Sequence, residues 1–179
     1  LNHRFVNYEN GEISVRHKGE LKSYEVEALV GADGPNSQVA KSANLYGERK
    51  FWIARQCRVK MKNNPELFKV YFGSQISNDF FGWVVPEDNN VARIGIGSEK
   101  NAEFYFKSFL NKLGNPEIID YQAGLIPIYD PKPRRSNGKV FLIGDAALQV
   151  KAISGGGIIK GMLAAEELSK ALLKNLVIS

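Results

Sequence analysis

The segment from Lys139 to Met162 constrains the fold of this chain more than any other part of the sequence. An apolar run, Val140 to Ile143, ends in Gly144-Asp145, and three glycines follow ten residues later at 155–157. The run is short and rich in branched residues, which predicts a buried strand. Ligands of open α/β sheets lie beyond the carboxyl ends of the strands, so we expect Asp145 to face a ligand.

The three glycines predict the start of an amphipathic helix beside that ligand, running from about Gly155 to Leu173. Glycines carry no side chain, so a flat ligand can approach their backbone closely. A helix that opens here also directs unpaired N–H groups and the positive end of its dipole toward any anionic group nearby. The segment therefore predicts a ligand site between one carboxylate and one helix N-terminus.

The composition fits a globular protein of one or two small domains. The chain has 179 residues, of which 44% are hydrophobic, enough to form a core. Its single cysteine, Cys57, excludes an internal disulfide and is compatible with a reducing cytoplasm. No apolar stretch approaches the roughly 20 residues of a membrane-spanning helix. The net charge of +5 suits an anionic partner, although the scattered lysines favour an ordinary solvated surface.

The rest of the sequence predicts a mostly β protein. Asn10-Gly11 suits a type I′ turn, and the alternating residues around it predict a β-meander over residues 4–31, ending in a short buried strand. Alternation and turn signals predict further strands over 50–98 and 118–128. Apolar residues spaced three and four apart predict a helix over 103–113.

These elements predict an α+β or α/β protein with a split nucleotide-binding domain. Residues 1–46 and 138–179 would be two pieces of a Rossmann-like domain, contributing the β-meander, the last strand and the C-terminal helix. Residues 47–137 would form an inserted antiparallel β-sheet domain. Within the first piece, Ser37 is suited to cap a brief helix that ends at about Ser42.

Three stretches together resemble one family of flavoproteins. They are Gly31-Ala-Asp-Gly-Pro-Asn-Ser37, Phe80-Phe-Gly-Trp-Val-Val-Pro86, and Gly144 through Met162. In order and spacing they are similar to the geranylgeranyl reductases, including the digeranylgeranylglycerophospholipid reductases that saturate archaeal ether lipids. The wider superfamily is that of the aromatic hydroxylases. The resemblance implies an FAD-dependent oxidoreductase that reduces carbon–carbon double bonds of geranylgeranyl chains in isoprenoid lipids.

The resemblance also implies which residues bind FAD. Asp145, in the Gly144-Asp145 motif, would accept a hydrogen bond from the ribityl or pyrophosphate region. Asp33 and Gly34 would help to hold the dinucleotide and its neighbouring loops. A further segment would lie under the flavin, and it consists of Gly155, Gly156, Gly157 and Ile158. Its N–H groups would face the ring edge that gains negative charge on reduction.

The inserted domain would bind the substrate. By resemblance, Phe81, Trp83 and Pro86 border the substrate cavity. A long isoprenoid chain needs an apolar tunnel, and aromatic walls supply a large contact area with few rotamers to freeze. The partner expected from the resemblance is therefore an isoprenoid lipid. A protein acting on it would be cytoplasmic and would touch the inner face of the membrane peripherally.

The chain also departs from the family pattern. The glycine-rich Gly-x-Gly-x-x-Gly turn that holds the FAD pyrophosphate is missing and would lie before Leu1, so we expect the chain to be the C-terminal portion of a longer protein. By itself it is expected to bind FAD weakly and to be inactive. Relatives tend to have Gly at Leu148, whose bulk would lie near the flavin, and Pro at Ala152.

Other functions stay open at this point. An FAD-dependent monooxygenase or halogenase shares the expected fold, and a cofactor-free, non-enzymatic fragment is a third possibility. Asp33 also suits a plain turn, and Phe81 and Trp83 also suit a core without ligand contact. No side chain stands out as a catalytic acid or base, and neither a metal site nor a nucleic-acid partner is expected.

Overall fold

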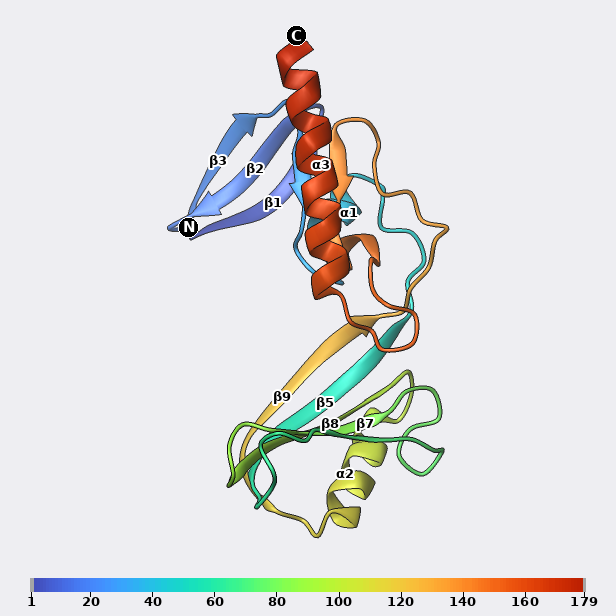
Figure 1. The fold of residues 1–179 in the computed structure, drawn as a ribbon. Helices are drawn as coiled ribbons and strands as arrows, with labels where there is room; N and C mark the ends of the chain where they lie inside the picture. Colours follow the sequence, from blue (N-terminus) through green and yellow to red (C-terminus); the bar gives the residue numbers. More distant parts are fainter. Residues whose placement is uncertain (1, 179) are drawn as a thin grey trace. The chain divides into compact units, whose positions relative to one another are not determined.

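The computed structural model describes residues 2–178, with side chains up to residue 174, and the chain divides into two compact units. Unit 1 joins Leu1–Arg49 to Pro127–Ser179, and unit 2 is Lys50–Ile126. The mixture of helices and antiparallel sheets agrees with the expected fold class (Figure 1). The assignment of 47–137 as a substrate domain, and of 1–46 and 138–179 as FAD-domain pieces, stays a prediction.

A three-stranded antiparallel meander opens unit 1. It consists of β1 (His3–Glu9), β2 (Glu12–His17) and β3 (Glu20–Glu25) in that order. Both connecting turns have positive φ angles at their two central residues, 52° and 91° at Asn10-Gly11 and 48° and 90° at Lys18-Gly19. A type I′ turn requires this conformation, and its twist matches that of the strands it joins. The expected meander is confirmed over residues 3–25, whereas the last strand of the predicted range of 4–31 belongs to a different sheet.

A two-stranded parallel sheet connects the two halves of unit 1. Strand β4 (Leu29–Gly31) pairs with β10 (Val140–Leu142) in the register Leu29 to Val140. Val140 and Leu142 are buried, as predicted for the strand before the Gly-Asp motif. The expectation of a buried strand before Gly31 is only partly correct, because Val30 is 38% exposed. Among residues 2–178 this sheet consists of two strands, so less of β4 is covered than in a wider parallel sheet.

Three helical segments follow the strands of unit 1. Helix α1 (Gln38–Ser42) is capped by Ser37, whose Oγ accepts a hydrogen bond from Ala40 N at 2.9 Å. A short 3₁₀ helix, η1 (Gly144–Ala147), directly follows β10 and was not expected. Helix α3 (Ile158–Ile178) is the longest element. Apolar side chains of α1, β10 and η1 form the core of this unit.

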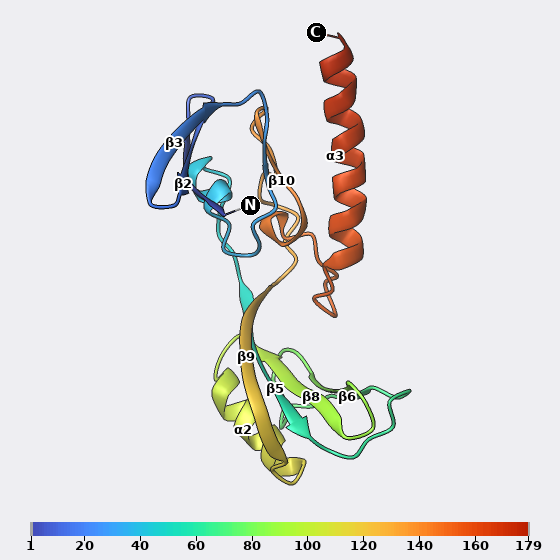
Figure 2. The same cartoon turned by 90° about the vertical axis from the view of Figure 1, so that its left-hand side faces the viewer.

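Helix α3 differs from the expected range of 155–173 at both ends. Gly155 adopts a left-handed conformation with φ 64° and donates its N–H to Lys151 O at 2.9 Å. This turn ends before the helix, which therefore begins three residues later than predicted. Helix α3 contacts η1, and Figure 2 shows most of its length standing apart from the meander. Several of its apolar side chains are accordingly exposed, namely Ile158, Ile159, Met162, Leu163 and Leu173.

Unit 2 is a five-stranded sheet covered on one face by a helix (Figure 1). The strand order is β6-β7-β8-β5-β9, with adjacent antiparallel pairs from β6 to β5. Helix α2 packs Phe106, Phe109 and Leu110 against the sheet, as its periodicity predicts. The bounds are β5 (Phe51–Lys60), β6 (Lys69–Tyr71), β7 (Gly82–Pro86), β8 (Val91–Ser98), α2 (Ala102–Lys112) and β9 (Glu117–Pro127).

Within residues 2–178, no helix combines the length and the apolar character needed to cross a bilayer.

Candidate functional site

Unit 1 contains a hollow of about 450 Å³ where η1 meets the start of α3. It brings together five of the eight residues predicted to bind the cofactor. Gly155, Gly156 and Asp33 do not line it. Its walls are Ala32, Gly34, Ile143, Gly144, Asp145, Gly157, Ile158, Gly161, Met162 and Ala165.

Asp145 is the ionisable side chain of this hollow. It lies in η1, is half-buried, and its burial raises the pKa of its carboxyl group above the ordinary value. Among the described residues no group donates a hydrogen bond to the Asp145 carboxylate. A half-buried carboxylate without a donor loses hydration without compensation. Asp145 is therefore well suited to accept hydrogen bonds from a ligand.

Gly157 lies directly against this carboxylate. A Cβ atom at position 157 would lie 2.5 Å from Asp145 Oδ1 and 3.3 Å from Val150 Cγ1. One turn further along α3, a Cβ at Gly161 would lie 3.4 Å from the Cα of Gly144. The absence of side chains therefore lets the start of α3 approach η1 closely and keeps the Asp145 carboxylate in place.

The backbone amides before α3 are only partly available to a ligand. The Gly155 N–H donates to Lys151 O, so it is not free to donate to a ligand as predicted. The first bond of the helix runs from Gly161 N to Gly157 O at 2.8 Å. In the part of the chain that the structure describes, the N–H groups of Gly157 and Ile158 have no acceptor. These two amides fit the predicted role.

Asp33 does not line the hollow, and its carboxylate is bonded within its own loop and the start of α1. Its Oδ1 accepts a hydrogen bond from Ser37 Oγ at 2.5 Å, and its Oδ2 accepts from Gln38 N at 2.7 Å and Val39 N at 3.2 Å. Both oxygens are thus engaged at the start of α1, which corresponds to the turn-forming alternative. Gly34, with φ 81°, does line the hollow.

Two arginines that sequence reasoning did not assign to the site hold η1. Arg49 Nη2 donates to Ala146 O at 2.9 Å, and Arg135 Nε donates to Ala147 O at 3.2 Å. Arg49 Nη1 also donates to Pro35 O at 3.2 Å, so it joins the Asp-Gly-Pro loop to η1. Burial lowers the pKa of Arg49, which lies 4.1 Å from the ring centroid of Tyr46. Neither arginine lies in a motif, so the sequence carried no signal for this role.

Leu148 also differs from the expectation. It caps η1 with a left-handed backbone, φ 56° and ψ 30°, which explains why glycine suits this position. Its side chain is only 1% exposed and does not line the hollow. Leu148 therefore lies outside the lining of the hollow, and its bulk near the flavin stays a prediction.

In unit 2, the predicted residues Phe81 and Trp83 belong to a larger group of contacting aromatic rings, which we call the aromatic cluster: Trp52, Phe72, Phe80, Phe81 and Trp83. Ring centroids of successive members lie 4.3 Å apart for Trp52 and Phe80, 4.2 Å for Phe80 and Phe81, 6.1 Å for Phe81 and Trp83, and 5.8 Å for Phe72 and Phe81. Trp52 and Phe72 were not predicted as site residues because they lie outside the motif.

Trp83 is held in one orientation by its neighbours. Its Nε1 donates to Gln56 Oε1 at 2.8 Å, and Gln56 Nε2 donates to Gln122 Oε1 at 2.6 Å. The indole ring lies directly on Gly95, where a Cβ atom would overlap it. Pro86 ends β7 opposite Ala92, three residues beyond Trp83, and its predicted substrate contact stays a prediction.

The sequence has characterised relatives. It is 40% identical over 152 residues to the chloroplastic geranylgeranyl diphosphate reductase of Nicotiana tabacum, covering 78% of this chain and 32% of that protein. It is 33% identical over 152 residues to digeranylgeranylglycerophospholipid reductase 1 of Methanosphaera stadtmanae, covering 78% and 38%. This chain is a homologue of the geranylgeranyl reductases. It spans about a third of the length of these relatives, and no protein-family model matches it.

Solved structures agree with the homology to these reductases. A geranylgeranyl bacteriochlorophyll reductase-like protein of Thermoplasma acidophilum has a TM-score of 0.79 and 26% identity, over 96% of this chain and 48% of that one. A probable FAD-dependent monooxygenase of Pseudomonas aeruginosa has a TM-score of 0.65 and 19% identity, over 97% and 54%. A flavin-dependent halogenase has a TM-score of 0.64 and 19% identity, over 86% and 32%. The last two share the fold, which confirms the expected fold class.

Proposed function

We propose that this chain is part of an FAD-dependent oxidoreductase that reduces carbon–carbon double bonds in the geranylgeranyl chains of isoprenoid lipids. The observation that carries the proposal is the half-buried Asp145 carboxylate, which receives no hydrogen bond from a described residue and lies beside a glycine backbone that approaches it closely. It occurs in a chain that is 40% identical to a geranylgeranyl diphosphate reductase over 152 residues.

The residues around the hollow fit FAD. Asp145 would accept a hydrogen bond from a ribityl hydroxyl group, and the amides of Gly157 and Ile158 would donate to the flavin edge that becomes negative on reduction. Gly34 and Gly144 would allow the close approach of the cofactor, since neither carries a side chain. When bound, FAD supplies the hydride for the double bond.

The aromatic cluster would bind the substrate chain. Phe81 and Trp83 offer apolar surface, and the hydrogen bond to Gln56 fixes the Trp83 indole without needing the ligand. A wall that is fixed beforehand loses little conformational entropy when a flexible isoprenoid chain binds. This arrangement suits a long apolar substrate with few polar groups.

The membrane contact belongs to the same proposal. A lipid substrate resides in a bilayer, so the enzyme would meet it at the cytoplasmic face of the membrane. The net charge of +5 would favour a surface that contains anionic lipids.

The test is an absorbance spectrum of the protein expressed from its complete reading frame, with the intact mass taken from the same sample. We expect flavin bands at a stoichiometric level. The reduced protein should then add hydrogen to geranylgeranyl diphosphate or to a geranylgeranyl lipid, detected by mass spectrometry of the product. A colourless protein that takes up no added FAD would overturn the proposal in favour of a cofactor-free fragment. Oxygenation or halogenation of an aromatic compound by a flavin-loaded protein that leaves geranylgeranyl chains unchanged would support the alternative enzymes.

A further inference from the structure

The outer strand of the unit 2 sheet and the loop before it expose a row of apolar side chains. We call Leu67, Phe68, Val70 and Phe72 the apolar edge. They are 58%, 67%, 37% and 74% exposed. Strand β6 is the first strand in the sheet order, so its outer side has no neighbouring strand among the described residues. Contiguous exposed apolar side chains mark a surface that contacts a partner or a membrane, which makes their presence informative.

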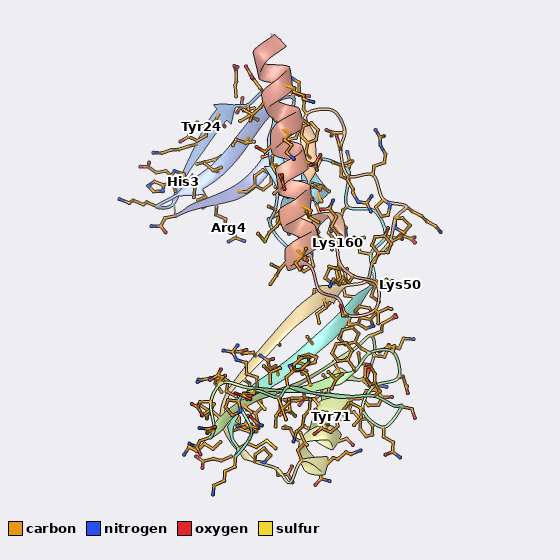
Figure 3. The ribbon with its side chains drawn as sticks, viewed as in Figure 1. His3, Arg4, Tyr24, Lys50, Tyr71 and Lys160 are labelled. Carbon is orange, nitrogen blue, oxygen red and sulfur yellow. The ribbon has the colours of Figure 1, made fainter. Side chains whose placement is uncertain are left out.

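Of the four residues, Val70 lies within β6, whereas Leu67 and Phe68 precede the strand and Phe72 follows it. Tyr71, labelled in Figure 3, turns toward α2 and packs against Phe109 with ring centroids 5.0 Å apart. Val70 pairs with Trp83 and Tyr71 with Gly82 in a regular antiparallel register. Side chains alternate along a strand, so Tyr71, which points toward α2, places Val70 and Phe72 on the opposite face of the sheet.

Charged side chains of both signs lie beside the apolar edge, because Glu66 precedes Leu67 and Asn63 Nδ2 donates to Asp88 O at 2.9 Å. Lys69 lies within the apolar edge and Lys62 precedes it, and neither forms an ion pair within residues 2–178. Glu66 is the single acidic residue between them. Exposed phenylalanine and leucine beside lysine is the composition of surfaces that lie in the headgroup region of anionic bilayers, where lysine stems run alongside the apolar groups.

The apolar edge is continuous with the aromatic cluster. The Phe72 ring contacts the Phe81 ring at 5.8 Å, and Phe81 contacts Trp83 at 6.1 Å. Contacting aromatic rings therefore connect the apolar edge to Trp83.

We propose that the apolar edge inserts into the headgroup region of a bilayer that contains anionic lipids, and that Phe72 guides an isoprenoid chain from there to Phe81 and Trp83. The second half of this inference rests on the proposed function, whereas the bilayer contact does not. The occupant is a lipid surface, because the lysines suit anionic headgroups. A second protein strand would pair with the free backbone edge of β6 but would leave the apolar side chains exposed.

The experiment measures co-sedimentation of the full-length protein with vesicles of phosphatidylcholine, with and without phosphatidylglycerol. The test variant is Leu67→Ser with Phe68→Ser, which leaves the aromatic cluster intact. Phe104→Ser is the matched control, because Phe104 is equally exposed at 68% but lies on α2.

We expect the double variant to lose roughly tenfold or more in vesicle partitioning, since two apolar side chains no longer enter the interface. The control should partition like the wild type. Lys69→Glu should weaken only the binding to vesicles that contain phosphatidylglycerol.

Two reductase assays separate this inference from the proposed function. The double variant should retain its activity on water-soluble geranylgeranyl diphosphate and lose activity on a geranylgeranyl lipid held in vesicles. Edge-dependent vesicle binding by a protein that reduces neither substrate would uphold the bilayer contact and defeat the proposed function. Equal partitioning of wild type and double variant would overturn the inference. A wild type that ignores vesicles but forms dimers that the double variant lacks would also overturn it, in favour of a second copy of this chain.

Discussion

At the scale of single residues, Asp145 combines three properties that rarely occur together by chance in a loop acid. It is half-buried, it receives no hydrogen bond from a described residue, and its pKa is raised by burial. Desolvated carboxyl groups without partners cost stability and cluster at functional sites. The local structure therefore gives up stability at the position where the proposed cofactor would bind.

We predict opposite effects of Asp145→Asn on stability and on binding. A raised pKa means that the folded state holds the proton of Asp145 more tightly than the unfolded state does. The ionised Asp145 carboxylate therefore lowers the stability of the folded state once the pH exceeds the ordinary pKa of an aspartate. The variant should therefore melt at a higher temperature than the wild type at neutral pH, and the difference should shrink in acid. Its affinity for FAD should fall by about tenfold to a hundredfold, since a hydrogen bond to a charged group contributes about 1.5–3 kcal/mol. Thermal melts across pH and FAD titration measure the two effects. Unchanged FAD affinity would contradict the assigned role.

Gly157 and Gly156 offer a matched pair. A methyl group at 157 would overlap Asp145 Oδ1, whereas at 156 the nearest atom, Ser154 Oγ, would lie at an ordinary contact distance of 3.5 Å. We predict that Gly157→Ala weakens FAD binding by more than tenfold, because the carboxylate or the start of α3 must move. Gly156→Ala should bind FAD like the wild type. Equal effects of the two substitutions, measured by flavin fluorescence, would rule out the close contact as the cause.

At the scale of elements, the hollow depends on how η1 is held. Arg49 joins Pro35 to Ala146 through two backbone carbonyl groups, so one side chain fixes the loop of the first motif against η1. We predict that Arg49→Lys lowers FAD affinity with little loss of thermal stability, because a lysine cannot reach both carbonyls with fixed geometry. Arg49→Ala should lower both. A change in the flavin reduction potential of the lysine variant would distinguish positioning from simple stabilisation. If Arg49→Lys binds FAD with wild-type affinity and potential, the joining role is excluded.

Elements with strong local signals could be predicted from the sequence. The Asn10-Gly11 turn sets two strands by its own backbone preference, and Gly114-Asn115-Pro116 ends α2 close to the predicted residue. The start of α3 could not be predicted, because the left-handed turn at Gly155 depends on its bond to Lys151 O. The predicted cofactor residues that the structure gathers in the hollow lie just after a strand end or at the start of α3.

The remainder of the candidate site depends on contacts between distant residues. Asp33 looks like a ligand in a motif, but the neighbouring Ser37 and amides use both of its oxygens. Arg49 and Ala146 are 97 positions apart in sequence, and no local pattern records that they meet. The same holds for Trp52, which joins the aromatic cluster through Phe80.

At the scale of the whole molecule, each unit has its own core, and Cys57 reports on that of unit 2. It is fully buried, and burial together with the nearby Asp120 carboxylate raises the pKa of its thiol to about 11. We predict that a thiol reagent at pH 8 labels the native protein only as unit 2 opens. Ile94→Ala, next to Cys57 in the sheet, should speed labelling by more than tenfold, since such a cavity costs about 2–5 kcal/mol. Fast labelling of the native wild type would contradict the burial of this thiol.

The parallel pairing of β4 with β10 has a consequence for the order of folding. The whole of unit 2 lies between these two strands in the sequence, so their contact must wait until a very long loop has closed. Unit 2 is continuous in sequence and pays a smaller entropic cost for its contacts, so it should form first. Both tryptophans of the chain, Trp52 and Trp83, belong to unit 2. Refolding followed by intrinsic fluorescence would therefore appear complete while β4 and β10 are still unpaired, and only a probe placed in unit 1 would record the slower step.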